Sequence, residues 1–263
     1  MTTDLNLTTP LSNRRGVGGE AALLSTTYFG PIQWYQKLYR YEQVIIDRQE
    51  PFVKQTYRNR CLIATTQGIQ ALTVPVVHSS QFRVHSSQLS MGGNDAQPNC
   101  EPCTVHCELT RISSHGNWRH LHWQALQSAY GESPFFEYYE DDLRPFFTEH
   151  NWEYLIDFNE AICQKMCELL DIHPNFLPPS SLLPPPSSPV PHPSSPVPPP
   201  SSLLLPPSSS DFRTVINPKH PLPDPDFEPR SYYQVYSQKH GFLPNLSILD
   251  LLLNMGPESI FYL

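Results

Sequence analysis

The sequence predicts an α/β protein: a small mixed sheet that starts with a β-α-β unit, is flanked by helices and carries a disordered Pro/Ser-rich insertion. Three observations predict this class. Two short β-type runs enclose a segment with helical spacing, a hairpin pattern follows them, and amphipathic helical segments come after the hairpin. With 263 residues, 39% of them hydrophobic, the chain is long enough to bury a sizeable core.

The predicted β-α-β unit lies at the start of the folded part. Leu23–Tyr28 suits a strand, and a Gly-Pro pair ends it. Ile32–Tyr41 places large apolar side chains at helical spacing, and Gln43–Asp47 is a β-branched run that ends in an acid. If the two strands are parallel, Tyr28 and Asp47 lie at their carboxyl ends, which is the edge where open α/β sheets bind ligands.

Five further elements follow along the chain. Two strands are joined by a Gln67-Gly68 turn, which predicts a hairpin, and three helices come later. The predicted strands are Tyr57–Thr65 and Ile69–Val77, and the predicted helices are one that starts at Trp118 with Asn117 as its N-cap, one over Trp152–Asp171 and one over Asn245–Asn254.

Composition divides the chain into parts. Residues 174–210 hold half of the 30 prolines, alternating with Ser-Ser pairs, which predicts a low-complexity segment that is extended or disordered. A repeated His-Ser-Ser-Gln motif and a Gly-Gly pair predict a loose insertion at 78–110. The predicted division is a disordered tail (1–21), an α/β core with that insertion (22–173), a Pro/Ser-rich linker (174–210) and a C-terminal part of the same domain (211–263).

The charge balance limits the partners. A formal net charge of -8 and a pI of about 5.7 argue against a protein that coats nucleic acid or an anionic membrane. No apolar run is long enough to span a bilayer, so no membrane insertion is expected. The first 20 residues lack the apolar centre of a secretory signal, which predicts a cytoplasmic protein whose six cysteines mostly stay reduced.

One cysteine-rich run has partial metal-site spacing. Cys100 and Cys103 form a C-x-x-C pair that is followed by His106 and Cys107. A structural zinc site usually joins two such pairs, and the sequence has no second one. We therefore predict no metal site, and keep a zinc-dependent module at these residues as a weaker hypothesis that metal analysis would test.

A basic run, Lys54–Arg60, stands out on this acidic chain. Strand alternation would send Arg58 and Arg60 to one face and Asn59 to the other. Two adjacent arginines repel each other unless an anion lies between them, so they bind either an anionic ligand or carboxylates of the protein. The candidate carboxylates are Asp47, Glu50 and the acidic run 140–142.

The run His115–Trp123 packs three histidines, two tryptophans and an arginine into nine residues. Helical spacing puts His122 on the apolar face and His120 and Arg119 elsewhere, so the histidines do not converge on a metal. The shared face is predicted to hold Trp118, Leu121, His122, Ala125, Leu126, Ala129 and, nearby, Tyr130. An inward histidine is either a core residue with its hydrogen bonds satisfied or a general base beside a stacking ring and a phenol.

Several runs of the chain, taken in order, resemble the WbqC-like proteins. The resemblance extends from about residue 23 to the end, outside the two predicted insertions, which are not expected to be part of the family pattern. The runs are Tyr28-Phe29-Gly30-Pro31, Val44-Ile45-Ile46-Asp47, Lys54 through Asn59-Arg60, Leu72-Thr73-Val74-Pro75-Val76, Trp118-Arg119-x-x-His122, Tyr130 with Pro134-Phe135-Phe136, and Asn245-Leu246-Ser247-Ile248-x-Asp250-Leu251.

The resemblance implies a bacterial protein of surface-polysaccharide (O-antigen type) biosynthesis, and one idea for its activity is transfer from an activated sugar or amino-acid donor. Many members carry a second acid after the strand-end aspartate, where this chain has Arg48, which weakens any metal site there. The polar residues that recur in the family fall on Asp47, Lys54, Asn59, Arg60, His122 and Asp250.

The leading hypothesis is therefore a cytoplasmic group transferase, with no cofactor identified. Asp47 is expected to bind a hydroxyl or amine and His122 to act as general base; these are the predicted catalytic residues. The amides at the helix start after Pro31 could add anion binding. The predicted substrate-binding residues are Lys54, Asn59, Arg60, Trp118 and Tyr130.

The alternative hypothesis is a non-catalytic adaptor in a glycan-assembly complex. In that reading the Pro/Ser-rich segment is a docking strap for a protein partner. Deleting residues 178–208 discriminates, because an enzyme should keep its activity and such an adaptor should lose its partner.

Overall fold

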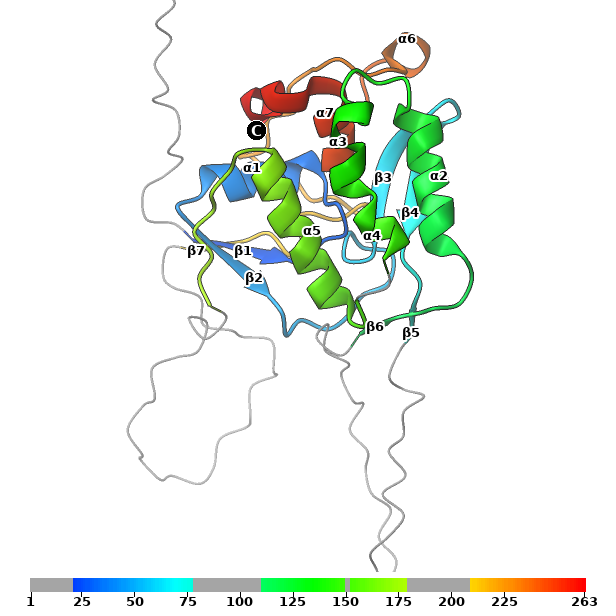
Figure 1. The fold of residues 1–263 in the computed structure, drawn as a ribbon. Helices are drawn as coiled ribbons and strands as arrows, with labels where there is room; N and C mark the ends of the chain where they lie inside the picture. Colours follow the sequence, from blue (N-terminus) through cyan, green and yellow to red (C-terminus); the bar gives the residue numbers. More distant parts are fainter. Residues whose placement is uncertain (1–20, 78–109, 150–151, 179–208) are drawn as a thin grey trace, which may run out of the picture.

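A parallel sheet joins the start of the chain to its C-terminal part. The computed structural model describes residues 21–77, 110–149, 152–178 and 209–263. The central strand β1 (Ala21–Ser25) lies between β2 (Gln43–Asp47) and β7 (Ser209–Asp211), and α1 (Ile32–Arg40) connects β1 to β2. Figure 1 shows the three strands side by side. The β-α-β unit and the α/β fold class are confirmed.

The register brings the strand ends to one edge. Ser25 pairs with Asp47, so β1 and β2 both end in a polar residue at the same level of the sheet. Leu23 pairs with Asp211, and the chain after β7 therefore leaves on the same side. This carboxyl edge is the place where an open parallel sheet presents its loops to a ligand.

Both ends of the segment predicted as a linker belong to the sheet. Ser209–Asp211 forms β7, and Phe176 makes a parallel bridge to Val44 on the outer side of β2. The prediction of a linker over 174–210 is wrong at these two ends. A Ser-Ser-Asp run has weak strand propensity, and backbone pairing with the apolar β1 decides its conformation instead.

The predicted hairpin is present with shifted bounds. Its strands are β3 (Arg60–Thr65) and β4 (Gly68–Thr73), so the two-residue turn is Thr66-Gln67 and Gly68 follows it at a φ of +108°. Residues 57–59 form a turn rather than strand, which removes the predicted alternation of Arg58 and Arg60 on one face. A second small pair joins β5 (Val76–Val77) to β6 (Arg111–Ile112).

The helices pack around this framework. The first and second predicted helices are confirmed as α2 (Trp118–Tyr130) and α5 (Leu155–Leu169), and the third as α7 (Ile248–Met255). The sequence reasoning did not predict α3 (Phe136–Leu143), α4 (Pro145–Thr148) or α6 (Ser237–His240), nor the last 3-10 helix (Gly256–Tyr262).

Helix α7 is the centre of the core. Each residue from Ile248 to Asn254 is buried, and the helix contacts α1, α2, α3 and β3. The Ser247 hydroxyl accepts a hydrogen bond from the Leu249 amide and caps its start. Gly256 ends it at a φ of +56°, a conformation that glycine commonly supplies at a helix C-terminus.

The buried face of α2 differs from the predicted one. Leu121 is 60% exposed, and Arg119, expected to face elsewhere, is only 8% exposed. The buried face includes two adjacent rows of side chains along the helix. Trp118 and His122 form one row, and Arg119 and Trp123 form the other. Because α2 packs against both α4 and β3, its buried face is wider than a single apolar stripe.

The described part of the chain contains no helix that is both long enough and apolar enough to cross a membrane.

Candidate functional site

Arg213 joins the ends of two parallel strands at the carboxyl edge. Its guanidinium donates to the Asp47 carboxylate over 2.6 Å and to the Asp211 carboxylate over 2.7 Å. The backbone amide of Gln49 donates to the other oxygen of Asp47. Burial alone would raise the pKa of Asp211, but the hydrogen bonds and charge of Arg213 outweigh it and lower that pKa.

A second ion pair lies at the same edge. Arg58 donates through two nitrogens to Glu50, and the Ser25 hydroxyl at the end of β1 donates to the same carboxylate. Asn159 of α5 donates to the Arg58 carbonyl and fixes the turn that carries it. Burial raises the pKa of Glu50, although Arg58 opposes this shift. For Arg58, the predicted alternative of pairing with a protein carboxylate is the one observed.

We call these five charged residues, Asp47, Glu50, Arg58, Asp211 and Arg213, the edge cluster. It holds three carboxylates and two guanidiniums, so one carboxylate is in excess. Its inner members are almost fully buried, while the side chains of Arg213 and Asp211 are 21% and 33% exposed. The cluster therefore reaches solvent at its outer end and suits a ligand that donates hydrogen bonds, such as an amine or a hydroxyl.

A small cavity lies beside the edge cluster. It has a volume of about 10 Å³, close to the space of one water molecule. Hydroxyls line much of it, and the Thr27 hydroxyl is buried without a hydrogen-bond partner among the described residues. The lining residues are Ser25, Thr26, Thr27, Trp34, Thr56, Tyr57, Arg58, Phe212 and Ile216. The loops after β1 and β7 thus meet here, on the two sides of a strand-order reversal.

His122 lies inside an aromatic group. Its Nδ1 is 2.9 Å from the Tyr28 hydroxyl, and its ring meets the Trp118 ring edge-on at 5.1 Å. Burial lowers the pKa of His122 to about 4, and a hydrogen bond to the Thr73 backbone opposes that shift. The imidazole is therefore neutral at neutral pH. The phenol beside it is Tyr28, whereas Tyr130 was predicted there.

Tyr130 belongs to a different network in the core. Its hydroxyl donates to Asp250 over 2.8 Å and accepts from the Ala64 amide. Tyr232 and Gln234 donate to the same carboxylate over 2.5 and 2.9 Å. Burial raises the pKa of Asp250, and these three donors oppose the shift. Tyr130 and Asp250, both singled out from the sequence, thus lie together in a buried network.

The basic run is divided among three environments. Lys54 is exposed in a turn, Asn59 donates its side-chain amide to the Val74 carbonyl, and Arg60 donates to the Thr73 hydroxyl. Thr73 therefore contacts Arg60 through its side chain and His122 through its backbone. In the described part of the chain, Asp47 bonds Arg213 and the Gln49 amide, and it makes no hydrogen bond or ion pair with Arg60 or His122.

The amides at the start of α1 are occupied. The Ile32 amide donates to the Leu246 carbonyl and the Gln33 amide donates to the Asn245 side chain. The expectation that they bind an anion is wrong, because a segment 212 residues away in the sequence caps this helix.

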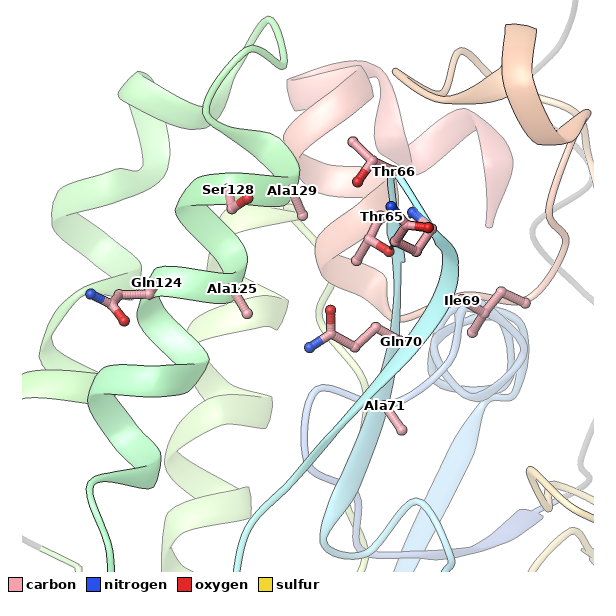
Figure 2. A pocket seen from close by; sticks show the side chains of 10 residues that line it. Thr65, Thr66, Ile69, Gln70, Ala71, Gln124, Ala125, Ser128 and Ala129 are labelled. Carbon is pink, nitrogen blue, oxygen red and sulfur yellow. Dashed lines mark hydrogen bonds between the residues drawn. The ribbon is translucent and has the colours of Figure 1, made fainter.

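A separate groove runs between α2 and the hairpin. It has a volume of about 650 Å³, and uncharged residues line it. Figure 2 shows Ala125 and Ala129 of α2 on one wall and Gln70 of β4 on the other. The predicted site residues do not line this groove.

Within residues 21–77, 110–149, 152–178 and 209–263, no group of three or more histidine, cysteine or acidic side chains is placed to hold a metal ion. The zinc hypothesis at Cys100 to Cys107 lies outside the described residues.

Two residues of the edge cluster, Asp211 and Arg213, were not predicted from the sequence. Asp211 ends a strand that has no strand-like sequence and Arg213 follows it, so nothing marked them as neighbours of Asp47. Glu50 and Arg58 were noted as an alternative pair, and the signal was the isolated acid next to the basic run.

The fold and the edge cluster define an α/β protein with a charged group at the carboxyl edge of a parallel sheet. The model of the WbqC-like protein family matches residues 26–99 and 105–188, and the chain belongs to that family. The matched ranges enter both predicted insertions, so the expectation that these lie outside the family pattern is wrong for residues 78–99 and 105–110 and for the start of 174–210.

One similar curated protein is Uncharacterized protein Rv1507c of Mycobacterium tuberculosis (strain ATCC 25618 / H37Rv). It is 24% identical over 153 residues, which make up 58% of this chain and 57% of that protein. The chain thus covers less than two thirds of that relative's length. No solved structure matches the chain.

Proposed function

We propose that this WbqC-like protein is a group transferase of bacterial surface-polysaccharide assembly, using an activated sugar or amino-acid donor. The observation that carries the proposal is the edge cluster, in which Arg213 links Asp47 of β2 to Asp211 of β7. The cluster lies beside a small cavity that hydroxyl side chains line. Charged residues at this edge are typical of small-molecule sites in open α/β sheets. The family resemblance supplies the substrate class.

In this proposal Asp47 receives the acceptor. Each of its oxygens accepts one protein hydrogen bond and keeps capacity for another. As the acceptor amine or hydroxyl forms its bond to the donor carbon, its proton passes to Asp47 and the activated leaving group departs with the bonding pair. Arg213 holds the carboxylate in place, and the excess negative charge of the cluster attracts an amine.

His122 has a positioning role in this proposal. A pKa of about 4 makes the ring a poor proton acceptor near neutral pH, since a general base works best when its pKa is near the working pH. Its contact with Tyr28 instead orients the loop that follows β1. The general-base role of His122 stays a prediction, as do the substrate-binding roles of Lys54, Asn59, Arg60, Trp118 and Tyr130.

The test is a binding screen of the full chain with UDP-, GDP- and dTDP-linked sugars, amino sugars among them, and with non-hydrolysable aminoacyl adenylates. Binding raises the Tm in a concentration-dependent way. We expect at least one compound to bind the wild type, and Asp47→Asn to weaken it about tenfold or more, which is the size of one lost charge-assisted hydrogen bond.

The matched control is Arg144→Gln, which removes a charge from an exposed residue and should leave binding unchanged. Asp211→Asn, at the outer end of the cluster, is the second variant if Asp47→Asn fails to fold. The proposal fails if none of these compounds binds, or if both cluster variants bind as the wild type does.

The alternative, a non-catalytic adaptor, has its docking strap within residues 174–210. Of these, the structure describes 174–178 and 209–210. The test of this adaptor hypothesis is the deletion of residues 178–208, with partner capture and transferase activity measured on the same preparation.

A further inference from the structure

Arg119 is a buried cation without a counter-charge in the described part of the chain. The residue is 8% exposed, and its Nε has no hydrogen-bond partner. Its guanidinium lies over the Trp118 ring, with its carbon 4.4 Å from the ring centroid. A guanidinium that is largely withdrawn from water and has no counter-charge is costly, so this arrangement favours the binding of a group that neutralises it.

The chemistry around Arg119 favours an anion. Burial raises the pKa of the Tyr28 hydroxyl, and the charge of Arg119 opposes this shift, so the guanidinium lies within electrostatic range of that oxygen. Tyr28 bonds the neutral ring of His122, and neither group supplies a formal negative charge to Arg119 at neutral pH. The surroundings of this cation are thus aromatic and uncharged, in contrast to the acid-rich edge cluster.

The start of α2 gives an independent observation. Asn117 occupies the N-cap position, but among the described residues its side chain accepts no hydrogen bond from the first-turn amides. The 13-residue helix carries no acid in that first turn. The start of α1, by comparison, is closed by Leu246 and Asn245. Free amides and the positive end of the helix dipole therefore lie at the turn of α2 that carries Arg119.

We propose that Arg119, stacked on Trp118 at the open start of α2, binds a compact oxyanion, a carboxylate or a phosphate group. Guanidinium and helix amides are the donors that recognise such anions, because they present N–H groups in a fixed geometry. The Trp118 ring holds the guanidinium plane in position. If the anion is part of an activated donor, this inference depends on the proposed transferase function. If the anion is a free oxyanion, the inference is independent of that function.

The test uses inorganic phosphate and acetate as probes on the full chain at constant ionic strength, with chloride as the reference anion. The readout is the arginine Nε–H signal in ¹⁵N-resolved NMR spectra, assigned by its loss in Arg119→Met. We expect one of the two oxyanions to shift this signal in a saturable way. Arg119→Met lacks the signal, so the concentration dependence of the Tm measures its affinity, which we expect to be about tenfold or more weaker than that of the wild type.

Phosphate also stabilises proteins generally by exclusion from their surface, so Tm shifts are compared between variants at the same concentration. Arg144→Met removes the same charge from an exposed site and should respond as the wild type does. Arg119→Lys keeps the charge and serves if Arg119→Met does not fold; it should bind more weakly than the wild type.

The proposal fails if phosphate, acetate and chloride have equal effects, or if Arg119→Met and Arg119→Lys bind the oxyanion as tightly as the wild type. Such a result would leave the nucleotide-sugar screen unaffected, because that screen reports on Asp47. Conversely, the donor screen could be negative while an oxyanion still binds in a saturable way. That result would overturn the transferase proposal and support the anion site at Arg119.

Discussion

Arginines at two places in this fold have opposite surroundings. At the sheet edge, Arg58 and Arg213 each meet carboxylates, and the cluster holds one acid more than it holds cations. At the start of α2, Arg119 lies over the Trp118 ring and within electrostatic range of Tyr28, which bonds the neutral His122. The difference suggests that the first two cations act within the protein, whereas Arg119 is placed for a partner that arrives from outside.

The largest expected effect is at the edge cluster. Arg58→Met leaves the Glu50 carboxylate buried without its cation, so we expect the free energy of unfolding to fall by about 3–5 kcal/mol. Urea denaturation measures this loss. Adding Glu50→Gln to the same variant should recover part of it, because the uncompensated charge is then removed.

Arg144→Gln is the matched control for that change. Its pair with Glu140 is exposed, so the expected loss is about 0.5 kcal/mol or less. If Arg58→Met lowered the free energy of unfolding no more than this control does, ion pairing at the sheet edge would contribute little to stability. The arginines at the sheet edge would then not differ from Arg119 in this respect.

The second effect, in size, is the pH dependence that His122 confers. Its pKa is lowered from 6.5 to about 4 by burial, so the unfolded chain binds more protons than the folded chain between these values. The neutral His122 therefore contributes fully to the free energy of unfolding above pH 6.5, and this contribution is lost as the pH falls towards 4. The expected size is about 3 kcal/mol.

The comparison variant is His122→Asn, whose amide oxygen can still accept a hydrogen bond from Tyr28. The difference in free energy of unfolding between wild type and variant should shrink on going from pH 7 to pH 4.5, measured by urea denaturation at each pH. A difference that stays constant over this range would mean that His122 titrates normally, and that the start of α2 is wetter than the structure indicates.

Local pattern was enough to predict the elements that surround these sites. Gln43–Asp47 was predicted with the bounds it has in the structure, because a β-branched run between turn residues has few alternatives. The inward orientation of His122 followed from helical spacing. The Asp47 position at the carboxyl edge followed from the expected parallel pairing, which is confirmed.

What could not be predicted depends on tertiary pairing. β7 has no strand-like residues and forms because β1 offers it an unpaired edge, so Arg213 could not be placed beside Asp47 in advance. Arg119 was expected to face away, since a charge beside an apolar stripe is normally solvated. Its burial results from α2 packing against several neighbours at once, which spacing along one helix does not reveal.

The direct test of the contrast is the stability of Arg119→Met in buffer free of phosphate and carboxylates, measured by urea denaturation beside Arg58→Met. Removing an unpaired buried cation relieves its desolvation cost and loses its contact with Trp118, so we expect a change within about 1 kcal/mol, or a gain. A loss of about 3 kcal/mol or more, comparable to that of Arg58→Met, would contradict the account by showing that Arg119 holds the fold together.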